Sequence, residues 1–194
     1  MKTSLFKAAC LSLISGVMFC GCGSSKKITP PKEEKVETSA YYSGTECKNT
    51  NKVFRCAGTG ESINQSTARN KAIKQARQGL AKTVSSLIAS STDAYVKAGR
   101  YYNKEELQNK FESLNREVVG KSLNETTIVC DKTTKTRQGF YKSYVCIEYD
   151  SGKLLENINN YASGQEIFNR DFNYDKFKNN FEKELNKITQ KRIP

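Results

Sequence analysis

Apolar residues recur at helical spacing between residues 62 and 88 of this 194-residue chain. Their intervals of three and four place them on one face of a long amphipathic helix. Three successive alanines leave little side-chain bulk on that face, so we expect the helix to approach a sheet or a second helix closely. Ser62 is the expected N-cap. The apolar face consists of Ala68, Ala72, Ala76, Leu80, Val84, Leu87 and Ile88.

The same spacing predicts a second helix further along the chain. Asn103 followed by Glu106 has the form of a helix-start cap, and apolar residues then repeat from Leu107 to Val118. The segment between the two helices, residues 90–103, either extends the first helix or forms a loop.

Two more helices are predicted in the last quarter of the chain. Ser151 is placed to cap a short helix that carries Leu154 and Ile158, and a polar loop follows it. The final helix has the clearer pattern, which is typical of a core-facing surface. Its apolar stripe consists of Tyr174, Phe177, Phe181, Leu185 and Ile188.

A short strand is predicted before the first helix, at residues 52–58. The motif Gly58-Thr59-Gly60 is expected to close it with a tight turn, from which the chain enters the helix at Ser62. A turn is favoured over a phosphate cradle at these glycines, because Glu61 would repel the anion.

Two further strands form a predicted β-hairpin. Residues 123–132 and 140–149 are rich in β-branched and aromatic residues, and residues 137–139 connect them. A three-residue loop with Gly139 in the left-handed conformation would pair residue 136 with residue 140. Position 130 would then lie opposite position 146.

The first 21 residues have the pattern of a lipoprotein signal peptide. Two lysines precede an apolar run, residues 8–19, that is too short to span a bilayer. Gly21 supplies the small residue expected before a modified cysteine, so Cys22 is the predicted lipidation site. Cys20 is the alternative, because the residue three positions before Cys22 is Phe19 rather than the usual leucine.

Residues 22–44 are expected to carry the lipid and act as a flexible tether. They include Pro30-Pro31, mixed lysine and glutamate, and almost no aliphatic residues, a composition that cannot bury a core. We expect an α+β domain at residues 45–150 and a helical extension packed on it at residues 151–194.

Four cysteines lie beyond the lipidation site, at Cys47, Cys56, Cys130 and Cys146. An even number in an envelope protein predicts disulfides, and the wide gaps between them disfavour a four-thiolate zinc site. The hairpin register favours Cys130 with Cys146, which leaves Cys47 with Cys56. If the first strand lies beside the hairpin, Cys56 instead meets Cys146 and Cys47 meets Cys130. Both pairings stay open here.

The charge of the chain and its lack of histidine limit the classes of function that it can have. The chain carries a formal charge of +12 at pH 7 and no histidine, so the commonest general base and the commonest transition-metal ligand are both missing. Ser62 has no base to activate it, and the carboxylate pairs Glu105-Glu106 and Asp171 with Asp175 are expected on solvated surfaces. We predict no enzymatic activity, no cofactor and no metal. The excess of lysine favours envelope anions as partners, rather than nucleic acid.

The order of the elements resembles the LPP-twenty lipoprotein family over residues 47–150. The features that carry the resemblance are the strand, the Gly58-x-Gly60-x-Ser62 segment, the alanine-striped helix and the hairpin that ends in Tyr144-Val145-Cys146-Ile147-Glu148. The resemblance implies an α+β fold, in which a long helix packs on a small three-stranded antiparallel or mixed sheet. Additional C-terminal helices lie outside the similar part. It also implies an envelope lipoprotein without enzymatic activity.

The chain is therefore expected to be a non-enzymatic outer-membrane lipoprotein that faces the periplasm, as a structural or protein-interaction module. Gly23 stands where an inner-membrane retention aspartate would be, which favours the outer membrane; surface display is the alternative orientation. The competing function is a module that binds cell-wall or lipopolysaccharide anions through a lysine-rich surface. The partner, the oligomeric state and any flagellar role are not specified by the residues.

Overall fold

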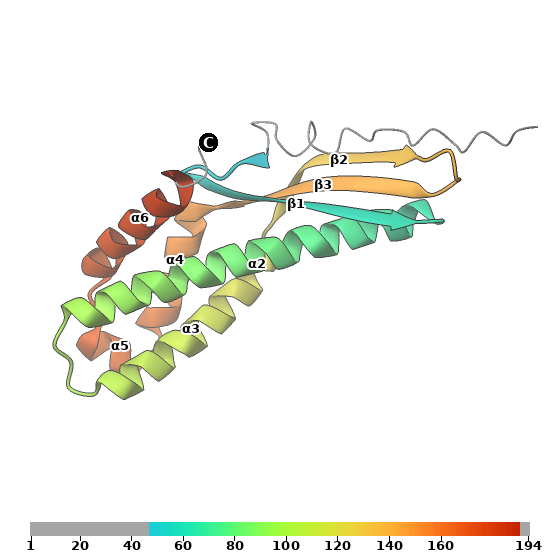
Figure 1. Ribbon diagram of the computed structural model, residues 1–194. Coiled ribbons are helices and arrows are strands. Elements are labelled where there is room, and N and C mark those ends of the chain that lie inside the picture. The colour runs from blue at the N-terminus through green and yellow to red at the C-terminus, as the bar shows by residue number, and fades with distance from the viewer. Residues whose placement is uncertain (1–46, 191–194) are drawn as a thin grey trace, which may run out of the picture. The chain divides into compact units, whose positions relative to one another are not determined.

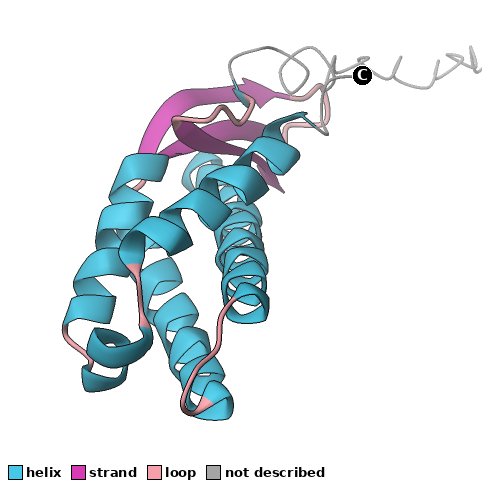
Figure 2. Cartoon of the chain, turned by 90° about the vertical axis from the view of Figure 1, so that its left-hand side faces the viewer, coloured by secondary structure: helices cyan, strands magenta, loops and turns pink. Residues whose placement is uncertain are grey.

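The computed structural model describes residues 47–190, which form a three-stranded sheet and five helices (Figure 1). The predicted α+β class is confirmed, because a 34-residue helix packs on a small antiparallel sheet and further helices follow it. The sheet forms one layer and the helices form the other (Figure 2). In chain order the elements are β1 (Val53–Ser62), α2 (Gln65–Ala98), α3 (Lys104–Asn124), β2 (Thr127–Lys135), β3 (Tyr141–Asp150), α4 (Ser151–Ser163), α5 (Glu166–Asp171) and α6 (Tyr174–Gln190).

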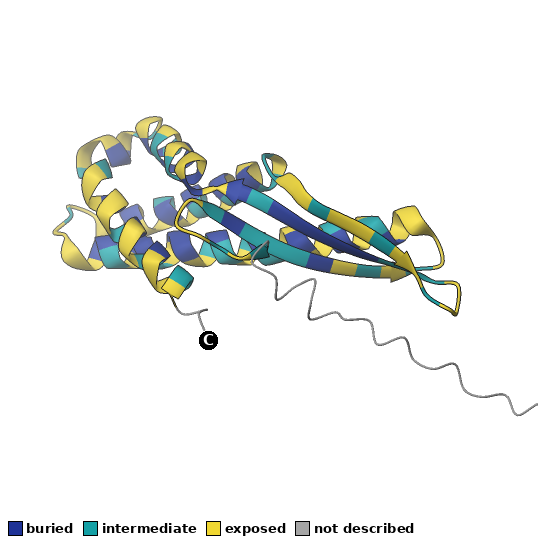
Figure 3. Ribbon diagram, turned by 90° about the horizontal axis from the view of Figure 1, so that it is seen from above, coloured by how far each residue is buried: buried dark blue, intermediate teal, exposed yellow. Residues whose placement is uncertain are grey.

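The last strand of the chain lies in the centre of the sheet. β3 pairs antiparallel with β1 on one side and with β2 on the other. Its residues Val145, Ile147 and Tyr149 belong to the core under the sheet. Figure 3 shows β3 largely buried, whereas β2 is exposed along most of its length. The central strand β3 and the outer strand β2 therefore lie in different environments.

The β2–β3 hairpin has the predicted turn. The N–H of Thr136 donates to the carbonyl of Phe140 at 2.8 Å, and Gly139 has a φ of 89°. This confirms the three-residue loop with a left-handed glycine, a conformation that glycine adopts without a steric cost. The predicted pairing of Cys130 with Cys146 in the register is also confirmed.

The start of the hairpin differs from the prediction. Residue 123 was expected to begin a strand, but α3 continues to Asn124 and β2 begins at Thr127. Leu123 is partly buried against the core from the helix, so its apolar side chain serves helix packing. A bulge follows, since the register shifts between Ile128 and Cys130.

Gly58 and Gly60 lie inside β1, not in a turn, which corrects the prediction for residues 58–60. The strand continues through both glycines to Ser62. A Cβ on Gly58 would overlap the carbonyl oxygen of Ala72, and a Cβ on Gly60 would overlap that of Ala68. The glycines are needed because β1 lies directly on the alanine face of α2. That apolar face is buried at all seven predicted positions.

Two predicted helix caps are displaced. α2 is capped by Asn64, whose side-chain oxygen accepts from the N–H of Thr67 at 3.2 Å. Ser62 is still paired in the sheet, and it therefore cannot begin the helix. Asp150 caps α4, and Ser151 is the first residue of that helix. Asn, Asp and Ser are about equally good N-caps. The sequence pattern alone therefore did not show which of two nearby residues is the cap.

The second half of α2 extends beyond the sheet and is surrounded by the other helices. Residues 90–98 continue the helix, and the loop begins at Gly99. α3 starts at the predicted cap, because Asn103 accepts from the N–H of Glu106 at 3.1 Å. α6 buries Phe177, Phe181 and Leu185, as its pattern predicted.

One helix was not predicted. The region expected as a polar loop before the last helix contains α5, which buries Ile167 and Phe168. Aromatic rings from α2, α3, α5 and α6 meet there and form the end of the core away from the sheet. They belong to Tyr95, Phe111, Phe168, Phe172 and Phe177.

Candidate functional site

A disulfide joins Cys47, which precedes β1, to Cys146 in β3. This corrects both pairings expected from the sequence. Cys146 bonds neither to Cys130 nor to Cys56, and Cys47 bonds neither to Cys56 nor to Cys130. The reason is the path of the chain, because the residues before β1 bring Cys47 to the sheet face on which the side chain of Cys146 lies.

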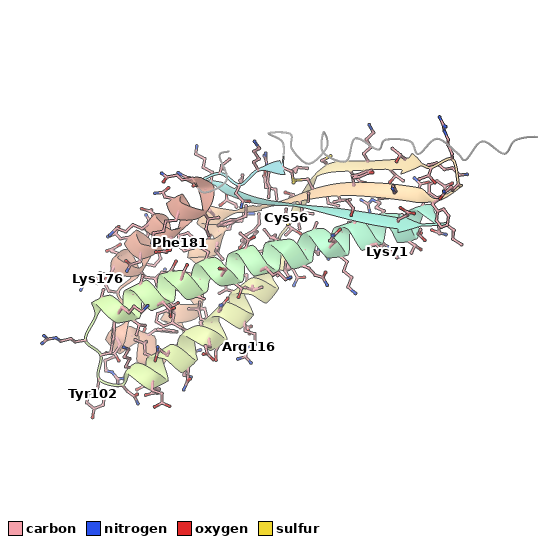
Figure 4. The ribbon with its side chains drawn as sticks, viewed as in Figure 1. Cys56, Lys71, Tyr102, Arg116, Lys176 and Phe181 are labelled. Atoms are coloured by element: carbon pink, nitrogen blue, oxygen red, sulfur yellow. A yellow bond between two sulfur atoms is a disulfide. The ribbon has the colours of Figure 1, made fainter. Side chains whose placement is uncertain are left out.

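The four cysteines are divided between the two faces of the sheet. Cys146 precedes Ile147, which faces α2, so the side chain of Cys146 lies on the outer face. Cys130 is the direct partner of Cys146 in β2 and shares that face. Cys56 pairs with Ile147 and faces α2, where its Sγ lies against Gly79 (Figure 4). Three sulfurs therefore gather on the outer face and one lies under the sheet.

The edge of β1 is covered by side chains. The N–H of Arg55 donates to Oδ1 of Asn49 at 2.8 Å, and the N–H of Thr59 donates to Oε1 of Gln75 at 2.6 Å. These bonds occupy backbone donors that would otherwise be offered to another strand. β1 is thus protected against strand addition at Arg55 and at Thr59.

The opposite edge strand, β2, carries an exposed apolar patch. Ile128 and Val129 are 43 % and 45 % exposed, at the bulge where regular pairing with β3 is interrupted. α2 packs against β1 and β3. Closer to the turn, β2 carries Lys132 and Lys135, charges typical of a guarded edge. We call Ile128 and Val129 the β2 patch.

A basic cavity of about 590 Å³ opens where α2 ends, between the loop after α2 and the start of α6. Arg100, Arg170 and Lys176 line it, and so does Asp171, which pairs with Arg170 at 3.0 Å. Figure 4 shows Lys176 on α6 at this end of the domain. The ion pair neutralises one cation, and Arg100 and Lys176 add positive charge to the lining. Asparagine side chains supply further hydrogen-bonding groups, at Asn173, Asn179 and Asn180.

Two tyrosines hold the wall of the basic cavity in place. The hydroxyl of Tyr95 donates to the carbonyl of Asp171 at 3.0 Å and accepts from the N–H of Asn173 at 2.8 Å. The hydroxyl of Tyr101 donates to the carbonyl of Tyr95 at 3.0 Å. Burial, and then the proximity of Tyr95, raise the pKa of Tyr101. The hydroxyl that makes this bond therefore stays protonated.

One predicted carboxylate site must be corrected. Glu105, Glu106 and Asp175 are exposed. The side chain of Asp171 is only 11 % exposed and is paired with Arg170, although a solvated position was expected. Its place follows from α5, the helix that the sequence pattern did not reveal.

Sequence reasoning missed the β2 patch and the basic cavity. The β2 patch was read as part of a regular strand, since alternation does not reveal which strand is left uncovered. Arg100 and Arg170 line the same cavity although they are 70 positions apart, and the sequence offers no periodic signal that brings them together. Tyr101 and Tyr102, two aromatic residues in a polar loop, were the available hint.

The predicted lipidation site Cys22 and the predicted tether lie outside the described residues. Within residues 47–190, no group of three or more His, Cys, Asp or Glu side chains could hold a metal ion. In the same part of the chain, no helix has both the length and the apolar character needed to cross a bilayer. Comparisons with protein families, with curated proteins and with solved structures found no match to this chain.

Proposed function

We propose that this chain is a non-enzymatic lipoprotein of the bacterial outer membrane, whose folded domain faces the periplasm and binds another envelope protein. The signal-like sequence of residues 1–21, the predicted lipidation of Cys22 and the predicted tether at residues 22–44 support the location. The resemblance to the LPP-twenty family over residues 47–150 also supports a non-enzymatic envelope lipoprotein. The observation that carries the interaction is the β2 patch.

The difference between the two edges of the sheet favours a partner at β2. Extended segments of a partner add to the free edge of a sheet through backbone hydrogen bonds, and apolar side chains give the contact its specificity. Asn49 and Gln75 block such addition at β1. The β2 patch offers Ile128 and Val129 beside an uncovered strand. We therefore assign the partner an extended segment with apolar side chains.

Photocrosslinking in living cells tests this assignment. A benzophenone amino acid at position 129 should give an adduct with an envelope protein, because the side chain lies at the proposed contact. The matched control is position 134, an exposed residue of the same strand. An adduct of equal yield at both positions, or none at 129, would contradict the proposal. An adduct with a second copy of the chain would show that the partner at this edge is the same protein and not another envelope protein.

A second candidate function is the binding of an anionic envelope polymer in the basic cavity. Arg100 and Lys176 place two cations beside a preformed cavity, and Tyr95 and Tyr101 fix its wall through hydrogen bonds. A carboxylate or phosphate on a cell-wall or lipopolysaccharide fragment would find charge and donors together there.

Binding of purified cell-wall polymer and of lipopolysaccharide tests the second candidate. Retention should weaken as ionic strength rises, and the double variant Arg100→Gln with Lys176→Gln should lose it. The matched control, Lys97→Gln with Lys183→Gln, removes the same charge from α2 and α6 outside the cavity lining. Equal losses of binding in both double variants would show that binding depends on net charge alone. That result would contradict binding in the basic cavity.

Membrane fractionation tests the anchor. Cys22→Ala should move the protein from the membrane fraction to the soluble fraction, because stable anchoring depends on the acyl chains. Cys20→Ala is the control and should leave the distribution unchanged. Membrane retention of the Cys22→Ala protein would contradict the lipidation site.

A further inference from the structure

We propose that Cys47, Cys130 and Cys146 form a sulfur exchange centre, in which the disulfide can pass from Cys47–Cys146 to Cys130–Cys146. The inference goes beyond the proposed function and does not depend on it, because it rests only on where the sulfurs lie. All three belong to the outer face of the sheet, and Cys146 is the member shared by both bonds.

The register brings Cys130 within bonding reach of Cys146. The two residues are direct antiparallel partners, and the Cα atoms of such partners lie about 4.5 or 5.5 Å apart. Both values fall inside the range of about 4.4–6.8 Å that disulfides span. The existing bond joins Cα atoms 6.0 Å apart. Cys146 is therefore placed to bond with either neighbour. The bulge directly before Cys130 leaves this part of β2 irregular.

The exchange is a balanced thiol–disulfide reaction. Cys130 loses its proton, and its thiolate attacks Sγ of Cys146. The new Cys130–Cys146 bond forms as the Cys47–Cys146 bond breaks, and the electron pair leaves on the sulfur of Cys47, which takes up a proton. One disulfide and one thiol are present before and after, so no oxidant or reductant is consumed.

Cys56 lies outside this centre. It is on the opposite face of the sheet, against Gly79 of α2, and β3 separates its strand from that of Cys130. Two strand spacings amount to about 9.5 Å, too far for a disulfide. Cys56 therefore provides an internal control for reactivity.

The exchange changes which segments of the chain the disulfide joins. In the observed state, the bond ties the segment before β1 to the central strand. In the alternative state, it staples the β2–β3 hairpin and releases Cys47. Asn49 then remains as a contact of that segment, through its bond to the N–H of Arg55. The centre can thus attach or release the N-terminal segment without unfolding the sheet.

Disulfide mapping of the full chain tests the proposal. Cleavage after Lys and Arg places the four cysteines in separate peptides, residues 36–48, 56–69, 122–132 and 143–153. The protein is held near about pH 8, where thiolate forms, then quenched with excess N-ethylmaleimide and digested without reduction. We expect a major species that links 36–48 to 143–153, and a minor one that links 122–132 to 143–153. The first should dominate, because it is the bond that the structure contains.

Three variants decide the result. Cys47→Ser should form the Cys130–Cys146 bond as its main species in a glutathione redox buffer, Cys130→Ser should lose the minor species, and Cys56→Ser should change neither. Full alkylation of Cys130 in both the wild type and Cys47→Ser would overturn the proposal. If Cys47→Ser fails to fold, the minor species of the wild type decides: its presence, and loss in Cys130→Ser, supports the centre, and its absence rejects it.

Discussion

At positions 58 and 60, hydrogen atoms in place of side chains set the distance between β1 and α2. The carbonyl oxygens of Ala72 and Ala68 occupy the space that a Cβ would need on Gly58 and on Gly60. Backbone on both sides of the contact leaves no flexible side chain that could move aside. The alanines of the helix and the glycines of the strand therefore act as one matched set.

Gly58→Ala should lower the free energy of unfolding by about 1–3 kcal/mol or more, because an overpacked interface must separate. Urea unfolding measures the loss. Gly120→Ala in α3 is the control, since no atom lies within 4 Å of the added methyl group; it should raise stability by about 0.5–1 kcal/mol. An equal response of the two variants would contradict the close-approach explanation.

Tyr101 should make stability depend on pH in the alkaline range. Burial raises the pKa of Tyr101 above its ordinary value of about 10, so the folded state holds a proton that the unfolded chain releases. The stability that this proton contributes is complete below the ordinary pKa of about 10. It is lost as the pH rises toward the pKa that Tyr101 has in the folded state. Urea unfolding of Tyr101→Phe should show a shallower alkaline decline than the wild type. Parallel declines would contradict the assignment.

At the scale of elements, the periodic segments were predictable, and their ends were not. The apolar face of α2, the Asn103 cap and the left-handed Gly139 could be read from local spacing, because each depends on neighbours within a few residues. The extent of β1 could not be read in this way. It depends on pairing with β3, from Ser62 with Tyr141 to Val53 with Asp150, far outside the local sequence.

The start of α2 offers a direct test of the corrected cap. Asn64→Ala should cost about 1 kcal/mol, because the N–H of Thr67 loses its acceptor. Ser62→Ala should cost less, because it removes only the longer bond that Oγ of Ser62 accepts from the N–H of Asn64 at 3.3 Å. Thermal or urea unfolding of both variants separates the two positions. A larger loss of stability in Ser62→Ala than in Asn64→Ala would instead support Ser62 as the cap, as the sequence pattern suggested.

At the scale of the whole molecule, the candidate sites were the least predictable part. The even number of cysteines pointed to disulfides, and the hairpin register placed Cys130 opposite Cys146. The bond nevertheless goes to Cys47, because the path of the chain before β1 is a tertiary feature without a local signal. The basic cavity has the same origin, since α2 and α6 create it only when packed.

The disulfide should contribute strongly to stability, because its cysteines are 99 positions apart. Loss of the bond in the double variant Cys47→Ala with Cys130→Ala, which cannot form the Cys130–Cys146 bond either, should lower the free energy of unfolding by about 2–5 kcal/mol under non-reducing conditions. Cys130→Ala alone, measured by the same denaturant titration, is the control and keeps the Cys47–Cys146 bond. A loss below about 0.5 kcal/mol in the double variant relative to Cys130→Ala, within the range of ordinary surface changes, would show that the bond adds little to the fold.

The same bond determines how the domain responds to mechanical tension. A pull on the chain ahead of Cys47 passes through the two sulfurs into the middle of β3 and bypasses β1. An edge strand pulled from its end peels away, and its hydrogen bonds break one after another. A strand with a neighbour on each side must instead shear both ladders together. With the proposed lipid anchor upstream, tension from the membrane would enter the sheet at its central strand rather than at an edge strand.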